Sequence, residues 1–157
     1  MANTMRWRYG ETNPVMMPVL VGYIIEIGDL VYLDAQSAKP ASAQTDGGTL
    51  AANQEGLHDK FLGVAMQASP DESTEPIRVA TSGVFEFDCL SATFEMGALV
   101  GAKEDSSGTE LENQFVIGVA TPNLAVGRCV KRVVPAGTKV LVDVVSTVVR
   151  GGPQPVA

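Results

Sequence analysis

Two short phrases occur twice in this chain and in the same order. Residues 25–34 (IEIGDLVYLD) and 94–103 (FEMGALVGAK) share an apolar residue, Glu, an apolar residue, Gly, any residue and Leu-Val. Each is followed by a second phrase, KFLGVAM at 60–66 and FVIGVAT at 115–121. A glycine inside an apolar strand permits the bend or bulge that curls a sheet. The pattern predicts a compact, single-domain, all-β barrel or sandwich built from two related halves.

The length and composition of the chain fit one globular domain. With 157 residues, of which 45% are hydrophobic and 18% charged, the chain can bury a real core. We expect an extended N-terminal arm over residues 1–14, a β domain over 15–149 and a flexible C-terminal tail over 150–157, where Gly and Pro are frequent.

Short β-branched runs separated by turn residues indicate strands throughout the middle of the chain. Residues 34–59 are small and polar, and we expect there a long surface loop or lid with one helical turn. Turns are predicted at 28–29, 82–83, 97, 107–108 and 136–137. Two further loops, 69–76 and 103–113, carry much of the acidity. The strands expected from this pattern are residues 19–25, 30–33, 61–66, 77–80, 84–87, 98–100, 115–119, 128–134 and 140–148.

No segment has the pattern of a membrane span or a secretory signal. The longest apolar stretch, residues 15–27, is interrupted by Pro18, Gly22 and Glu26, whereas a span needs roughly 20 predominantly apolar residues. The first ten residues have two arginines but no apolar segment behind them. We therefore expect no membrane partner and assembly in a host cytoplasm.

The net charge of −7 is unevenly distributed. Residues 11–112 contain 4 basic and 17 acidic side chains, whereas residues 113–157 contain 5 basic and 1 acidic. A mostly acidic chain repels the phosphate backbone, which argues against a nucleic-acid partner. Two interpretations stay open: complementary patches between copies of the chain, or solvated surface charge without a partner.

Residues suited to catalysis or cofactor binding are scarce. The single histidine, His58, has no nucleophile pattern near it, and the two cysteines, Cys89 and Cys129, give no zinc-type spacing. Both cysteines lie among apolar residues, which is typical of buried thiols, with a disulfide as the alternative. The matched Glu26 and Glu95 could form a carboxylate pair, but a structural role in their turns is favoured. We expect no enzyme activity, no cofactor and no metal site, although weak calcium binding by the 69–76 loop stays an alternative.

The N-terminal arm has the residue types of an interface. It contains the only tryptophan and no periodic apolar pattern, and Trp, Tyr and Arg carry much of the energy of protein interfaces. The alternative is that its aromatic side chains close the bottom of the chain's own barrel. The candidate residues for contact with a capsid or a neighbouring subunit are Arg6, Trp7, Arg8, Tyr9, Asn13 and Pro14.

Several phrases together resemble one protein family. They are RYGETNP at 8–14, EIGDLVYLD at 26–34, FLGVAM at 61–66, IRVATSGVFEFD at 77–88, GALVG at 97–101 and VIGVA at 116–120. The chain is similar in these phrases to the small decoration, or cement, proteins of tailed-phage capsids. The resemblance implies a compact β domain, often a homotrimer. It would bind the major capsid protein on the outer surface of the virion and hold the shell against internal DNA pressure.

Two other classes of function remain possible on the same residues. A tail or head-fibre subunit of the virion would use repeated β units equally well. A carbohydrate-binding or adhesion module would use an exposed aromatic platform. An enzyme is the least favoured class, because the chain has one histidine and no catalytic motif.

Overall fold

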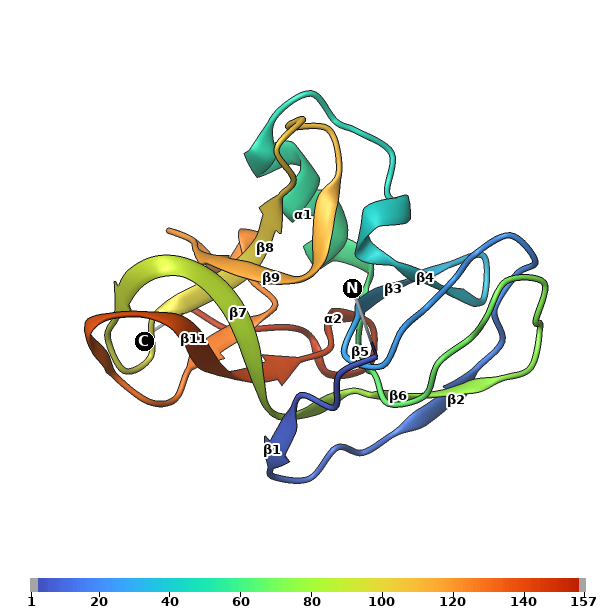
Figure 1. Ribbon diagram of the computed structural model, residues 1–157, viewed down its shortest axis with the longest axis horizontal. Helices are drawn as coiled ribbons and strands as arrows, with labels where there is room; N and C mark the ends of the chain where they lie inside the picture. Colours follow the sequence, from blue (N-terminus) through green and yellow to red (C-terminus); the bar gives the residue numbers. More distant parts are fainter. Residues whose placement is uncertain (1–2, 156–157) are drawn as a thin grey trace.

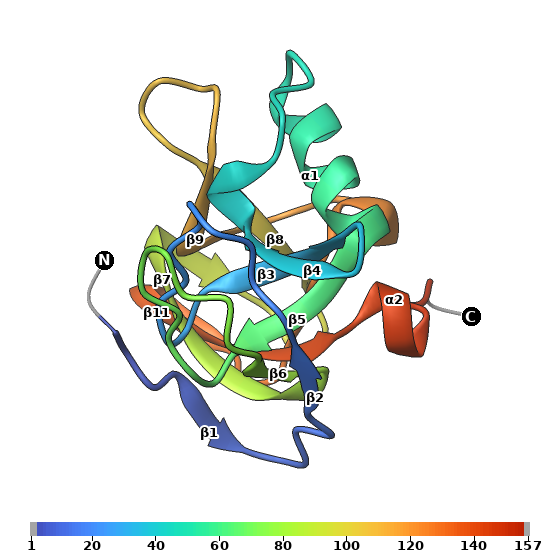
Figure 2. The same cartoon turned by 90° about the vertical axis from the view of Figure 1, so that its right-hand side faces the viewer.

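The computed structural model describes residues 3–155, which form two β-sheets side by side along the longest axis of the molecule (Figure 1). A barrel-like sheet occupies one end and a second, open sheet the other. One longer helix, α1 (Leu50–Lys60), lies on the side opposite β1 (Trp7–Tyr9), as Figure 2 shows. The compact, all-β character predicted from the sequence is confirmed.

The first sheet closes on itself. Its strands are β7 (Ser82–Phe94), β11 (Val133–Val145), β10 (Gly127–Cys129), β8 (Leu99–Glu104) and β9 (Leu111–Gly118), hydrogen-bonded in that order. β9 then returns to β7 in parallel, with Asp88 opposite Phe115 and Cys89 opposite Val116. β1 adds to the outside of this ring, antiparallel to the first residues of β7.

The second sheet is antiparallel throughout. Its order is β2 (Val15–Met17), β6 (Ile77–Ala80), β5 (Phe61–Ala65), β3 (Leu30–Asp34) and β4 (Ser37–Pro40). The remaining elements are short: the 3-10 helices η1 (Ala41–Ala43) and η2 (Pro122–Leu124), and α2 (Thr147–Arg150).

Two groups of buried side chains hold these sheets. The larger fills the barrel and reaches α1 and β5; its largest completely buried side chains are Phe61, Phe85, Phe87, Leu30 and Leu57. The smaller lies on the second sheet and includes Val19, Ile25, Val31, Leu62 and Val79. Complete burial of such side chains contributes roughly 1.5–3 kcal/mol each, so the two groups account for the main favourable term in folding.

The repeated phrases occupy corresponding places in the two sheets. In the first copy Val31 of β3 lies opposite Gly63 of β5, and in the second Val100 of β8 lies opposite Gly118 of β9. The turns before β3 and β8 also match, since Asp29 N donates to Glu26 O and Ala98 N to Glu95 O, at 3.1 and 3.0 Å. Beyond these pairs the connections differ, because β5 continues to β6 whereas β9 closes on β7.

Two glycines of the first copy are required by close backbone approaches. A Cβ on Gly28 would lie 2.5 Å from Thr4 O, because the N-terminal arm crosses this turn, and the residue has φ +99°. A Cβ on Gly63 would lie 1.7 Å from Ala80 O of the neighbouring strand. At Gly118, the counterpart of Gly63, the nearest heavy atom is 3.8 Å away, so only the first copy needs its strand glycine for space.

The expectation of a long loop at residues 34–59 is wrong. The segment contains β4, η1 and the 11-residue helix α1, which begins after Thr49, whose hydroxyl accepts a hydrogen bond from Ala52 N. Besides Leu57, the buried side chains of α1 are the amides Asn53 and Gln54, and Gln54 donates to Ala102 O at 2.8 Å. The helix is attached through polar groups, so its sequence lacks the apolar periodicity that would have predicted it.

The expected strand at residues 19–25 and two expected turns are also wrong. Pro18 precedes the first segment, and Tyr23 N bonds back to Leu20 O at 3.3 Å, so the run forms a turn whose ends, Val19 and Ile25, are buried and whose middle is exposed. Residues 82–83 lie at the start of β7 and residues 136–137 lie within β11, where the pairing with β7 shifts register between Val133 and Lys139. A glycine accommodated by a bulge has the same local signature as one in a turn.

Candidate interaction surface

The N-terminal arm runs along its own domain instead of projecting from it. Thr4 N donates to Ile27 O at 2.9 Å, and β1 places Trp7 opposite Phe85 and Tyr9 opposite Val84 on β7. Further along, Thr12 O accepts from Thr81 N at 2.9 Å. Residues 1–2 of the predicted arm lie outside the described residues. The arm is therefore an added edge strand of the barrel-like sheet.

Arg6 is directed into the molecule and is only 5% exposed. Its Nε donates to Gln114 Oε1 at 2.7 Å, one terminal nitrogen donates to Glu86 O at 3.2 Å, and the other donates to Asp88 Oδ2 at 3.0 Å. Lys139 of β11 donates to the other oxygen of Asp88. Lys139 first and Arg6 second hold the pKa of the Asp88 carboxyl below its usual range.

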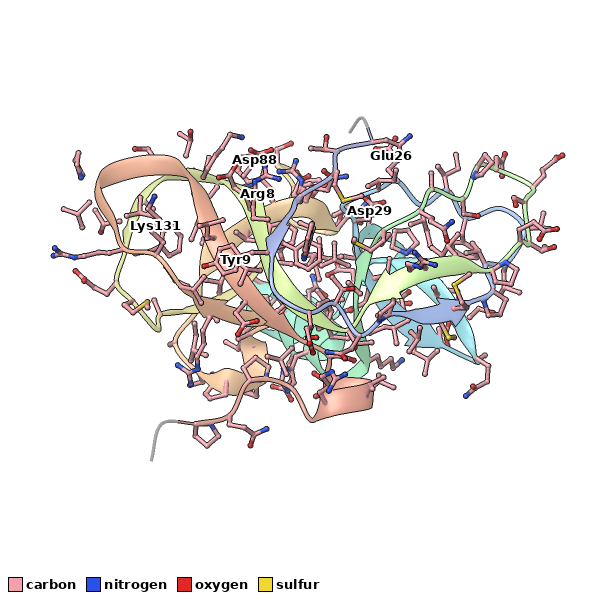
Figure 3. The ribbon with its side chains drawn as sticks, turned by 90° about the horizontal axis from the view of Figure 1, so that it is seen from below. Arg8, Tyr9, Glu26, Asp29, Asp88 and Lys131 are labelled. Carbon is pink, nitrogen blue, oxygen red and sulfur yellow. The ribbon has the colours of Figure 1, made fainter. Side chains whose placement is uncertain are left out.

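The network continues from Arg6 into the turn before β3. The fully buried Gln114 donates to Asp29 Oδ1 at 2.8 Å and to Ile27 O at 3.2 Å, and Asp29 Oδ2 accepts from Glu26 N at 2.9 Å. Burial raises the pKa of the Asp29 carboxyl. Asp88 and Asp29, at the two ends of the network, are labelled in Figure 3. Arg6 thus connects the arm with the barrel and, through Gln114, with the second sheet.

The aromatic residues of the arm point outward. The exposed fractions are 39% for Trp7 and 52% for Tyr9, and Met5, which precedes β1, is 47% exposed. Trp7 Nε1 donates to Gly10 O at 3.0 Å, a contact within the arm. These side chains do not close the barrel; they form an exposed apolar strip along β1.

The other three candidate residues are also at the surface. Arg8 pairs with Glu86 at 3.2 Å, an exposed contact. Asn13 has a positive φ of 40° and donates to Ser82 Oγ at 2.9 Å, and Pro14 is exposed. Five of the six candidate residues are thus accessible, whereas Arg6 is buried in its own domain. Whether the five bind a partner stays a prediction.

The described part of the C-terminal tail, residues 150–155, contacts its own domain. Arg150 Nε donates to Thr81 Oγ1 at 3.2 Å, and Arg128 donates to Gln154 O. Gly152 and Pro153 are buried. Residues 156–157 of the predicted tail lie outside the described residues.

The residues considered for chemistry have structural contacts. His58 Nδ1 lies 2.8 Å from Ala125 O, and Glu95 forms an exposed ion pair with Arg132 at 2.8 Å. Cys89 and Cys129 are buried and free, as predicted for structural thiols, and burial raises the pKa of Cys89. Within residues 3–155, no group of three or more His, Cys, Asp or Glu is placed to hold a metal ion. No helix in this part of the chain is long and apolar enough to cross a membrane.

Sequence reasoning missed a second exposed apolar group. Leu20, Val21 and Ile24 were expected in a strand, but they are 46%, 60% and 55% exposed at one end of the molecule. The signal that could have identified them is Pro18 together with Gly22, which together favour a turn.

Comparison with known proteins gives no family for the chain: no protein-family model matches it, and neither a curated protein nor a solved structure is significantly similar to it.

Proposed function

We propose that this protein is a structural component of a tailed-phage virion that decorates the outer surface of the capsid and stabilises the shell. The partners would be the major capsid protein and other copies of the chain, as in the homotrimers that the resemblance implies. Neither nucleic acid nor membrane is a proposed partner, and no catalysis is proposed.

One observation carries the proposal: exposed aromatic side chains stand on a strand that is fixed in place. Trp7 and Tyr9 project from β1, which β7 pairs and Arg6 anchors. β1 ends the strand order of its sheet, so its outer edge has no strand partner within the described residues. Such an edge can take up an extended segment of another protein, with main-chain bonds giving affinity and side chains giving specificity.

Co-sedimentation with undecorated shells of the cognate phage tests this surface. Replacing both Trp7 and Tyr9 with Ala should lower the affinity at least tenfold, because truncated aromatic anchors typically cost about 2 kcal/mol or more each. The matched control is Val148→Ala, which removes an exposed apolar side chain on α2, and it should bind as the wild type does. Undiminished binding by a folded double variant would remove the arm from the proposal.

The exposure of Trp7 and Tyr9 also supports a second candidate, a carbohydrate-binding or adhesion module. Aromatic faces stack on sugar rings, and Trp7 is the only tryptophan, so its fluorescence reports directly on this strip. A saturable fluorescence change on titration with host surface glycans, without binding to shells, would favour the module. A tail or head-fibre subunit would instead be recovered with tails or fibres after the particle is dissociated.

We also infer that the two β pairs carrying the repeated phrases arose as related halves. The support is their common register, Val31 opposite Gly63 and Val100 opposite Gly118. Backbone superposition of residues 25–34 and 60–66 on residues 94–103 and 115–121 tests the idea. A fit no closer than that to an unrelated antiparallel pair of equal length would contradict it.

A further inference from the structure

One end of the molecule combines exposed apolar side chains with acidic ones. Residues 18–24 and 69–76 meet there, joined by bonds in both directions between Ile25 and Ser69 at 2.9 and 2.8 Å. They lie at the right-hand end of Figure 1. We call this surface the acidic tip; it comprises the exposed Leu20, Val21 and Ile24 with the exposed carboxylates Asp71, Glu72 and Glu75.

The acidic tip contains no basic side chain. Residues 61–77 and 9–38 both lack Lys and Arg, and the nearest cation that follows the 69–76 loop is Arg78 on β6. The carboxylates of Glu72 and Glu75 accept no hydrogen bond from any residue between 3 and 155. Lys39 lies over the ring of Tyr23 in this segment, 4.7 Å from its centre, but it pairs with Asp34. The carboxylates of Glu72 and Glu75 therefore have no cationic partner among the described residues and lie next to apolar surface.

The opposite end combines exposed apolar side chains with basic ones. A hollow of about 310 Å³ is lined by three basic side chains, one acidic side chain (Glu86) and apolar residues of β11, among them Val134 and Leu141. The basic ones are Lys131, Arg132 and Lys139, of which Lys139 pairs with Asp88 and Glu86 pairs with Arg8. Leu90, Met96 and Val134 are 59%, 70% and 51% exposed. We call this surface the basic end; it lies where β7 and β11 curl at the left of Figure 1, and Figure 3 labels Lys131 there.

The basic end has cationic groups available for a partner. The side chain of Lys131 is exposed and has no hydrogen bond or ion pair with any described residue. Arg132 pairs only with Glu95, and both side chains of that pair are more than 60% exposed. Residues 128–139 contain four basic residues and no acidic one. The positive charge here is neutralised only in part within the chain.

We propose that the acidic tip of one copy of this chain docks on the basic end of a second copy. The two surfaces have opposite charge, both expose several large apolar side chains, and they lie at opposite ends of the longest axis. Apolar side chains would supply the buried area, and the charges would set the orientation. Tip against tip, or basic end against basic end, would place like charges together, so the contact is head to tail.

A head-to-tail contact has consequences that a two-fold symmetric one lacks. It generates a closed ring where the rotation between copies closes, and an open chain where it does not. It also weakens with salt, because exposed charges are screened within about 8 Å at physiological ionic strength. This contact concerns copies of the chain in solution, so it stands or falls independently of capsid binding.

Charge reversal at each end tests the contact by sedimentation velocity at low ionic strength. The wild type should sediment as a species heavier than the 16.5 kDa chain. A tip variant, Glu72→Lys with Glu75→Lys, and an end variant, Lys131→Glu with Arg132→Glu, should each associate about tenfold or more weakly, because each places like charges opposite one another in the interface. The variant with all four changes should regain association, since its charges are again opposite.

A control with matched charge keeps the test specific. Glu110→Lys with Glu112→Lys reverses two carboxylates of the loop before and at the start of β9, away from both surfaces, and should associate as the wild type does. A monomeric wild type would overturn the proposal. Failure of the folded four-residue variant to regain association, or loss of association in the control, would also overturn it, because the charges would then not face one another.

Discussion

Replacing Arg6 with Met should destabilise the protein far more than the same change at Arg8. Removal of the Arg6 guanidinium leaves Gln114 Oε1, which is fully buried, without the donor 2.7 Å away. An orphaned buried acceptor costs about 1–3 kcal/mol. Asp88 keeps its ion pair with Lys139, and its side chain is 23% exposed. Loss of the Arg6–Asp88 contact therefore adds little to the cost. We expect a decrease in the free energy of unfolding of about 2–3 kcal/mol.

Arg8→Met is the matched control on the same arm. The Arg8 side chain is 41% exposed and its partner Glu86 is 30% exposed, so the pair contributes at most about 1 kcal/mol. Urea unfolding should be followed by circular dichroism, which reports the sheets, and by the fluorescence of Trp7, which reports the arm. A loss below about 1 kcal/mol for Arg6→Met, or an equal loss for Arg8→Met, would refute the anchoring role of Arg6.

Two further predictions concern Gly63 and the two network carboxylates. Gly63→Ala should yield little folded protein, because the added Cβ would lie 1.7 Å from Ala80 O, whereas Gly118→Ala should cost less than about 1 kcal/mol; comparable thermal unfolding of both variants would contradict this reasoning. Asp88 has a lowered pKa in the folded state, so the unfolded chain binds more protons in acid, and stability is lost as pH falls through the folded pKa. Asp88→Asn should flatten that acid branch in urea titrations between about pH 2 and pH 5. Asp29 has a raised pKa, so its contribution has the opposite sign: stability falls as pH rises from the unfolded value to the folded one, and Asp29→Asn should remove that fall. An unchanged pH profile in either Asn variant would refute the corresponding assignment.

The parts of the fold that the sequence predicts are those with local signals. The phrases at residues 30–33, 61–66 and 115–119 form β3, β5 and β9, because short continuous runs of apolar, β-branched and aromatic residues fit buried strands. Helix α1 was missed because its buried face consists of Asn53, Gln54 and one Leu, and the acceptor of Gln54 is a carbonyl 48 residues away. A polar face that is satisfied by distant partners has no local signature.

The N-terminal arm is a second feature whose structure depends on residues far away in the sequence. Arg6 and Arg8 are identical residues two positions apart, and an extended chain would place them on the same face. The structure buries one and exposes the other, because the pairing of β1 with β7 shifts register and because Gln114, 108 residues away, is positioned to accept from Arg6. Sequence reasoning could identify the arm as an interface candidate. It could not show that Arg6 anchors the arm while Arg8 stays at the surface.

The burial of Arg6 and the exposure of Trp7 and Tyr9 bear on how the arm would bind a partner. A free arm must lose backbone freedom on docking, at roughly 1–2 kcal/mol for each residue ordered, and that loss subtracts from affinity. Here the ordering accompanies folding, since Arg6, Thr4 and Thr12 fix the arm to its own domain before any partner arrives. Trp7 and Tyr9 are thereby held as a preorganised strip. If the arm binds as proposed, the buried Arg6 would contribute to the affinity by holding Trp7 and Tyr9 in place.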